Sequence, residues 1–326
     1  MYHSRWKKSH REAGYKYGNT LYKFGKTIKL DKMLNDEKIR YANQVYGIYE
    51  KHFPEIIDEI KGFAEGVRLD FLKVFAFLTT MYVFTFENYC SCIGISNKDG
   101  VFLARNSDFN KAIGKLTDST FYKLDKGYSF IGNTTAMIQI EDGINEKRLA
   151  CGLTFVYPTV KGVGFNAGFL IRYILEKCAT VKEAREFLEK VEVGSSQNII
   201  VVDTIGKVLL AELNSEKKYF EEISEGALYR TNHFISKNML SYKCKLDDDI
   251  KSHARLETLK GQKYNEYSLE DTKCLLSGNK GFLCQYNKKQ DFDTIWSVIY
   301  DIKKNKIYRC EGNPSIKKFL LDSRWE

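Results

Sequence analysis

The pattern of apolar and polar positions predicts helices before residue 88 and mainly strands after it. A helical period follows Asp36 and runs to Lys51, a second helix follows Pro54 over 55–65, and an apolar helix starts at Asp70 and runs to Phe86. Alternating positions then predict strands over 119–130, 134–142, 148–156, 199–203, 208–213, 294–301 and 306–310, with helices over 169–177 and 180–190 between them. Runs of strands with helices in separate blocks predict an α+β fold, an αββα sandwich of two antiparallel sheets with outer helices.

A hairpin within residues 90–109 brings charged residues close to a cysteine. Two apolar-rich strands, 92–96 and 101–105, flank a turn in which Gly100 can take a positive φ. With a three-residue loop, Cys90 pairs with Asp108 across the hairpin. Arg105 then starts on the other face, and it reaches the thiol only if a bulge or a strand end occurs near Asn106.

Cys90 is a candidate nucleophile, and the residue types leave three interpretations open. If the bond between Tyr89 and Cys90 is cut, the freed α-amine, with a pKa of roughly 7.7–8.0, can act as the base of the thiol while Asp108 holds the ammonium form. The second interpretation is a cysteine–histidine pair with His233 or His253. The third is a small buried hydrophobic residue without any chemistry.

Composition and charge favour a single folding unit without a metal or a nucleic-acid partner. The 326 residues are 43% hydrophobic with only 3 prolines, so the chain can bury a large core and offers no linker. The net charge is +9, but lysines are interleaved with Asp and Glu and no groove-reading motif occurs. The eight cysteines lack the paired spacing of a structural zinc site, and the acidic triplet at 247–249 lacks that of a calcium loop.

The chain is expected to be cytoplasmic, with no membrane span. Its first residues contain no apolar signal segment, and the longest uncharged apolar run, 74–86, is too short to cross a bilayer. Cysteines without disulfide-type spacing fit a reducing compartment.

The order of motifs resembles the cysteine N-terminal-nucleophile (Ntn) hydrolases, a group that includes penicillin acyltransferase precursors, choloylglycine and penicillin V hydrolases, and acid ceramidase. Cys90 stands where that group has its nucleophile, RNSD at 105–108 matches its Arg-Asn-x-Asp, and Asn232 follows Thr231 as in its Thr-Asn element. Arg255 matches its later arginine, and two blocks at 162–184 and 294–314 resemble its scaffold. The chain departs from the acyltransferase precursors at Tyr89, where they have glycine, and at Ser91, where they have threonine.

The resemblance implies an autoprocessed amidohydrolase or acyltransferase that acts on a linear amide C–N bond through an acyl-cysteine. It implies a removable helical segment over 1–89 and a catalytic core over 90–326. It also implies roles for side chains of the core. These are Cys90 as nucleophile, Arg105, Asp108, Asn232 as oxyanion donor, Arg255 behind the nucleophile and, more weakly, Asn166 in the substrate pocket.

The expected partners are a small-molecule amide or acyl thioester and the chain's own cleaved N-terminal fragment, with no cofactor and no metal. Two alternatives stay open: an acyl-CoA-dependent N-acyltransferase, and an unprocessed, non-catalytic binding protein on the same fold. The sequence leaves undecided which acyl group and amine are used, whether water or an amine accepts the acyl group, how efficiently the Tyr89–Cys90 bond is cut, and whether a homo-oligomer forms.

Overall fold

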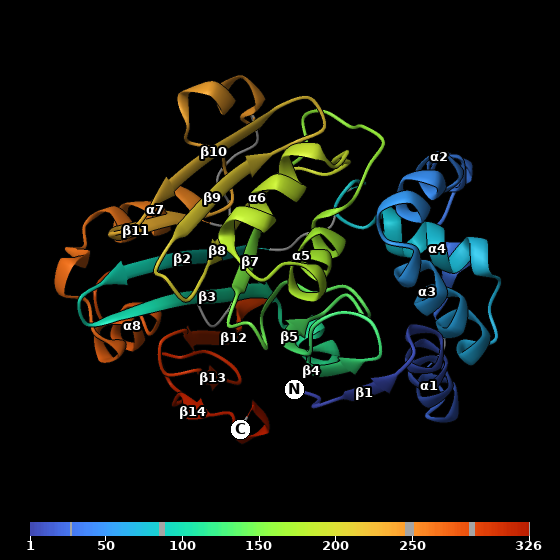
Figure 1. Cartoon of the computed structure of the whole chain (residues 1–326), viewed down its shortest axis with the longest axis horizontal. Helices are drawn as coiled ribbons and strands as arrows, with labels where there is room; N and C mark the ends of the chain where they lie inside the picture. The colour runs from blue at the N-terminus through green and yellow to red at the C-terminus, as the bar shows by residue number, and fades with distance from the viewer. Residues whose placement is uncertain (27, 85–88, 245–250, 287–290, 326) are drawn as a thin grey trace.

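Two β-sheets lie face to face in the computed structural model, which describes residues 1–26, 28–84, 89–244, 251–286 and 291–325 (Figure 1). The larger sheet contains, in spatial order, β1 (Arg5–Lys8), β4 (Asp118–Leu124), β5 (Phe130–Thr134), β6 (Asp142–Asn145), β7 (Ala150–Phe155), β8 (Gln197–Val202), β9 (Val208–Leu213) and β10 (Lys218–Ile223). The smaller sheet contains β11 (Gly226–Arg230), β2 (Tyr89–Asn97), β3 (Gly100–Asn110), β12 (Phe292–Asp301), β13 (Lys306–Cys310) and β14 (Leu320–Leu321). Neighbouring strands are antiparallel except for β1 and β4, which are parallel.

Helices cover the outer face of each sheet, which confirms the predicted αββα fold. Apolar side chains of six helices form one core with the outer face of the larger sheet: α1 (His10–Lys23), α2 (Asp36–His52), α3 (Pro54–Val67), α4 (Phe71–Thr80), α5 (Ala167–Lys177) and α6 (Val181–Lys190). On the other side, α7 (Ser252–Lys260) and α8 (Leu269–Leu276) pack on the smaller sheet. A third core, which includes Leu103, Leu210 and Trp296, lies between the two sheets. Among the described helices, none has both the length and the apolar character that crossing a bilayer requires.

The helix α1 and the strand β1 were not predicted. The burial of α1 depends on backbone contact with α3 and not on an apolar stripe. A Cβ atom added to Gly14 would lie 2.0 Å from the carbonyl oxygen of Glu59, and one added to Gly62 would lie 2.1 Å from that of Arg11. Gly18 and Gly66 make equally close contacts on the next turn. The two helices therefore pack backbone against backbone, and the capping box of Ser9 was the available sequence signal for α1.

The end of α4 and the conformation of residues 135–141 also differ from the prediction, each for a local reason. The helix α4 ends at Thr80 and not at Phe86, because the hydroxyls of Thr79 and Thr80 bond back to carbonyls of the preceding turn and Tyr82 has a φ of 65°. Residues 135–141, predicted as part of a strand over 134–142, form a turn instead, in which Glu141 accepts hydrogen bonds from the N–H and the hydroxyl of Thr135.

Candidate active site

The hairpin of β2 and β3 positions the candidate nucleophile, in a register that differs by one residue from the prediction. Cys90 pairs with Ser107, and Asp108 pairs with Tyr89. The loop is shorter than predicted because Oδ1 of Asn97 accepts hydrogen bonds from the N–H groups of Asp99 (2.9 Å) and Gly100 (3.0 Å), and Gly100 does not adopt a positive φ. The predicted pairing of Cys90 with Asp108 was therefore wrong.

This register separates the hairpin side chains into two groups. Facing residues share one side of a sheet, so Cys90, Cys92 and Arg105 point into the space between the sheets. Asp108 points the other way, toward the layer of α7 and α8, where it accepts hydrogen bonds from Tyr286 (2.9 Å) and Thr294 (2.6 Å). Arg105 therefore reaches the thiol without the bulge that the predicted register required.

The Cys90 thiol and the Arg105 guanidinium share one acceptor on the facing sheet. The sulfur lies 3.3 Å from the carbonyl oxygen of Leu153, and Nε of Arg105 donates to the same oxygen at 2.8 Å. Arg105 is held in turn by the carboxylates of Asp142 (2.7 Å) and Glu141 (3.3 Å). The side chains of Arg105 and both acids are fully buried, so the sulfur lies beside a fixed positive charge.

The backbone of Cys90 is held by two side chains from distant parts of the chain. Its N–H donates to Oδ1 of Asn232 at 3.0 Å, and its carbonyl oxygen accepts from Arg255 at 2.7 Å. Arg255 also donates to Oδ1 of Asn232 at 2.7 Å and lies 3.7 Å from the carboxylate of Asp108. The amide nitrogen of Asn232 donates to the carbonyl of Phe155 at 2.8 Å and lies 3.9 Å from the Cys90 sulfur. The structure thus brings Cys90, Arg105, Asp108, Asn232 and Arg255 into one network.

Burial sets the protonation of this network. Burial raises the pKa of the Cys90 thiol, and the nearby Arg105 guanidinium opposes that rise. Burial also raises the pKa of the Asp108 carboxyl, against the opposing effect of Arg255. The Cys90 thiol is therefore protonated at neutral pH, and a thiol needs a base before it can attack a carbonyl.

A model of one protein family matches residues 95–316. Its description is acyl-coenzyme A:6-aminopenicillanic acid acyl-transferase. The chain belongs to this family.

Membership of this acyl-transferase family places the chain among the Ntn-type amidases and acyltransferases, and the two covered sheets agree with that fold. Arg105, Asp108, Asn232 and Arg255 lie within the matched residues, whereas Cys90 lies just before them. No curated protein matches the chain.

Solved structures of three enzymes resemble the chain at low identity. An N-acylethanolamine-hydrolyzing acid amidase ortholog from Caenorhabditis elegans is 16% identical, with 66% of this chain and 93% of that chain covered and a TM-score of 0.49. A conjugated bile acid hydrolase from Clostridium perfringens is 15% identical, with 73% and 93% covered and a TM-score of 0.49. A penicillin V acylase from Agrobacterium tumefaciens is 13% identical, with 68% and 82% covered and a TM-score of 0.43.

The structure also describes contacts of Asn166, His233 and His253, the remaining candidate residues of the predicted site. Asn166 caps α5 by accepting from the N–H of Phe169, and its amide donates to the carbonyls of Leu78 (2.8 Å) and Met81 (3.1 Å). It therefore joins the end of α4 to the start of α5. Nδ1 of His233 lies 2.7 Å from the Ser252 hydroxyl, and the His233 and His253 rings lie 4.1 Å apart.

Sequence reasoning missed the groups that hold the five network residues. Ser252 accepts from the backbone N–H of Asn232 at 2.9 Å and thereby fixes the loop after β11. The acidic pair Glu141 and Asp142, which interrupts an apolar stretch, was a visible signal for a buried cation. The carbonyls of Leu153 and Phe155 left no signal, because backbone acceptors do not depend on residue type.

A buried charge cluster joins the helices before residue 89 to the core after it. His10, Glu59 and Glu176 place their ligand-type atoms within 4.8 Å of one another. The Arg172 guanidinium donates to Glu59 at 2.7 Å and to Glu176 at 2.5 Å, so a side chain already occupies the position of a cation between these acids. The triplet at 247–249 lies outside the described residues.

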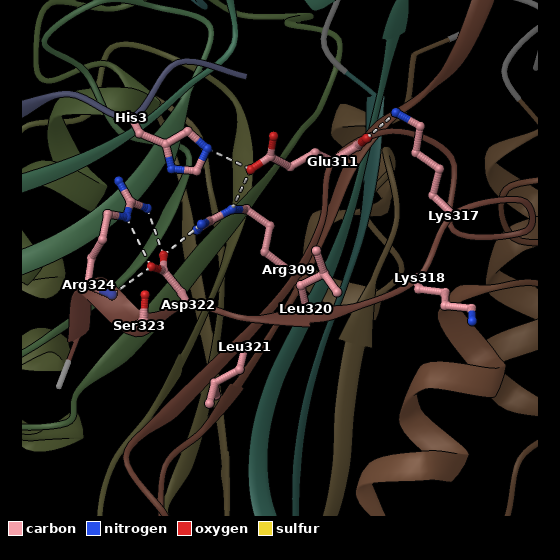
Figure 2. A pocket seen from close by; sticks show the side chains of 10 residues that line it. All are labelled: His3, Arg309, Glu311, Lys317, Lys318, Leu320, Leu321, Asp322, Ser323 and Arg324. Atoms are coloured by element: carbon pink, nitrogen blue, oxygen red, sulfur yellow. Dashed lines mark hydrogen bonds and ion pairs between the residues drawn. The ribbon is translucent and has the colours of Figure 1, made fainter.

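A cavity of about 560 Å³ lies at the far edge of the smaller sheet (Figure 2). Figure 2 shows His3 and Arg309 directed at Glu311, and Arg309 and Arg324 directed at Asp322. The cavity is lined by His3 and by residues of β13, β14 and the segments next to these strands, and β3 and β12 separate β13 from β2, the strand that contains Cys90. This cavity therefore belongs to a different part of the molecule from the Cys90 network.

Proposed function

We propose that the chain is a cysteine Ntn enzyme that cuts its own Tyr89–Cys90 bond and then breaks or exchanges a linear amide bond through an acyl-Cys90 intermediate. The proposal rests on one observation, which is that side chains hold both backbone groups of Cys90. Its N–H donates a hydrogen bond to Asn232, and its carbonyl oxygen accepts one from Arg255. A cysteine that only fills space needs its side chain packed, not both of its backbone groups held by buried polar side chains. Family membership supports the same chemistry.

Self-cleavage is proposed to follow an acyl shift from nitrogen to sulfur. The Cys90 sulfur adds to the carbonyl carbon of Tyr89, the C–N bond breaks, and the thiol proton ends on the released nitrogen. Water then hydrolyses the thioester, which leaves a carboxylate on Tyr89 and a free α-amine on Cys90.

The mature enzyme is proposed to use that amine as its base. The amine takes the thiol proton, the sulfur attacks the substrate carbonyl, and the ammonium returns a proton to the leaving nitrogen as the C–N bond breaks. An acyl-cysteine and a free amine result. Attack by water then gives hydrolysis, and attack by a second amine gives acyl transfer.

The remaining network residues have distinct proposed roles. The amide of Asn232 lies 3.9 Å from the sulfur, close enough to donate to an oxyanion on a carbon bonded to that sulfur. Oδ1 of Asn232 holds the nitrogen that becomes the amine, the role that the sequence predicts for Asp108. The carboxylate of Asp108 instead lies 3.7 Å from the guanidinium of Arg255 and keeps it in position. The charge of Arg105 favours the thiolate form of Cys90. Asp108 and Arg255 are thus positioning residues.

The cleaved fragment 1–89 is proposed to remain bound as a subunit. It supplies β1 to the larger sheet, next to β4. It also supplies Glu59, whose carboxylate pairs with Arg172 of α5 inside the core. Separating the two pieces would leave these buried charges without partners, which is strongly unfavourable.

The test is acylation of Cys90. Purified protein is incubated with N-acyl amino acids, bile-salt-like amides and acyl thioesters, and the peptide that starts at Cys90 is analysed by mass spectrometry. We expect an acyl adduct on that peptide with at least one amide. An adduct from acyl thioesters alone supports the acyl-CoA-dependent transferase, and no adduct from any compound supports the non-catalytic binding protein.

The identity of the base is tested by comparing Asp108→Asn with His233→Ala and His253→Ala. Under the proposed scheme the histidine variants retain most of the single-turnover acylation rate. Asp108→Asn loses on the order of a hundredfold, because Arg255 and Asn232 are no longer held in place. Melting temperatures of all three variants serve as the folding control. A histidine variant without acylation, together with a nearly normal Asp108→Asn, would show that a cysteine–histidine pair does the chemistry.

A further inference from the structure

A basic and apolar patch lies where α1 and α3 end, in the helical part of the molecule that Figure 1 shows to one side of the sheets. The two helices run in the same direction, since Gly14 contacts Glu59 and Gly18 contacts Phe63 one turn later. Their C-terminal ends therefore lie together. We use the name amphipathic patch for the exposed basic, aromatic and thioether residues there: Tyr22, Lys23, Phe24, Lys26, Lys29, Lys32, Met33 and Arg68. The acid Asp31, which is also exposed in this stretch, pairs with Lys73.

The backbone directs Phe24 outward. The N–H of Gly25 bonds to the carbonyl of Tyr22 and that of Lys26 to the carbonyl of Leu21, with Gly25 at a φ of 64°, which is the Schellman ending of a helix. In this motif an apolar residue usually follows the glycine and packs back on the helix, but here Lys26 occupies that position. Phe24, the C-cap residue of α1, is 76% exposed.

The four lysines of the amphipathic patch differ from three surface lysines of the helical part that form ion pairs. Lys8, Lys61 and Lys73 form ion pairs with Glu12, Asp58 and Asp31. Within the described residues, none of Lys23, Lys26, Lys29 and Lys32 forms an ion pair. These charges are therefore available to an anionic partner.

We propose that the amphipathic patch docks the protein on an anionic lipid bilayer. Clustered lysines are attracted to acidic headgroups, and an exposed aromatic residue among them can enter the boundary between headgroups and acyl chains. Phe24 is the side chain for insertion, and Met33, which is 49% exposed, adds apolar area. A purely electrostatic contact would not require exposed apolar side chains such as Phe24 and Met33. A lipid surface offers both acidic headgroups for the lysines and acyl chains for these apolar side chains.

A nucleic-acid partner fits the amphipathic patch less well. Single-stranded nucleic acid is bound by stacking successive bases on several aromatic rings, but the guanidinium of Arg68 lies 4.0 Å from the ring centre of Tyr22 and donates to its hydroxyl. Phe24 is then the one aromatic ring of the amphipathic patch that Arg68 leaves uncovered. The proposal is independent of the chemistry at Cys90, because every residue of the amphipathic patch lies within residues 22–68 and none belongs to the network around the thiol.

Sedimentation with vesicles tests the proposal on the full-length protein. We expect the protein to sediment with vesicles of equal parts phosphatidylcholine and phosphatidylglycerol, to remain in solution with phosphatidylcholine alone, and to be released by added salt. Reversing two charges, with K26E and K29E together, should lower the partition coefficient about tenfold or more. Phe24→Ser should lower it too, and the fluorescence of Phe24→Trp should shift to the blue on binding.

Matched control variants lie elsewhere on the surface. Lys303 and Lys304 are exposed in the turn between β12 and β13, and Ile205 is as exposed as Phe24 at 76%. K303E with K304E, and Ile205→Ser, should bind vesicles like the wild type. Equal loss in control and patch variants, or equal binding to both kinds of vesicle, would overturn the proposal. Binding to single-stranded nucleic acid with the same lysine dependence, and none to vesicles, would also overturn it.

Discussion

Cys90→Ala should remain a single uncut chain and should form no acyl adduct with any substrate, whereas the wild-type protein should appear as two fragments divided between Tyr89 and Cys90. The sulfur is the only heavy atom removed, and in the proposed scheme it is both the attacking atom of self-cleavage and the carrier of the acyl group. The side chain is fully buried and small, so its truncation should cost only about 1 kcal/mol of folding free energy. Intact-mass measurement of both proteins decides the result.

Cys92 provides the matched control for this experiment. The Cys92 thiol lies on the same face of β2 as the Cys90 thiol and is equally buried. This burial raises the pKa of the Cys92 thiol. Cys92→Ala should therefore be cut and acylated like the wild type. Wild-type protein that is active but uncut would contradict the maturation step, and cleavage of Cys90→Ala would assign the cut to a host protease.

Asn232→Ala should acylate Cys90 about a hundred to a thousand times more slowly than the wild type, which corresponds to roughly 3–4 kcal/mol of transition-state stabilisation. The substitution removes the amide that lies near the sulfur and also the oxygen that holds the backbone N–H of Cys90. Substrate affinity should change little, because the oxyanion exists only after attack. Single-turnover mass spectrometry and equilibrium binding measure the two quantities separately.

Asn232→Asp distinguishes the two functions of this side chain. It retains an oxygen for the N–H of Cys90 and for Arg255 but has no amide donor. If the amide stabilises the oxyanion, Asn232→Asp should be about as slow as Asn232→Ala. A fast Asn232→Asp would mean that Asn232 only holds its neighbours, and a lower melting temperature with normal acylation would make the asparagine structural.

The layers of the fold were predictable from sequence where burial follows an apolar pattern. The strands over 199–203 and 208–213 alternate with a clear turn between them, and both occur as β8 and β9. The helix α1 could not be found in this way, because glycine leaves no hydrophobic signal and its contact with α3 is made by backbone atoms. The family match confirms the resemblance that the order of motifs indicated.

The geometry of the candidate site was less predictable than its composition. Two hydrogen bonds accepted by the Asn97 side chain shorten the hairpin loop, and that change alone moves Asp108 away from Cys90 and places Arg105 beside it. The loop that carries Asn232 reaches Cys90 from 142 positions along the chain, through contacts with α7 that no local pattern encodes.

The position of the proposed cut in the fold has a consequence for the reversibility of unfolding. Residues on both sides of position 89 contribute to one apolar core, and β1 from the first piece completes the larger sheet that the second piece forms. Once the Tyr89–Cys90 bond is broken, the two pieces must find each other in solution to refold, so refolding changes from a first-order to a second-order process. The melting temperature of the processed protein should then rise with protein concentration, while that of an uncut chain should not. A mature enzyme built in this way is protected mainly by slow unfolding and cannot readily be regained after denaturation.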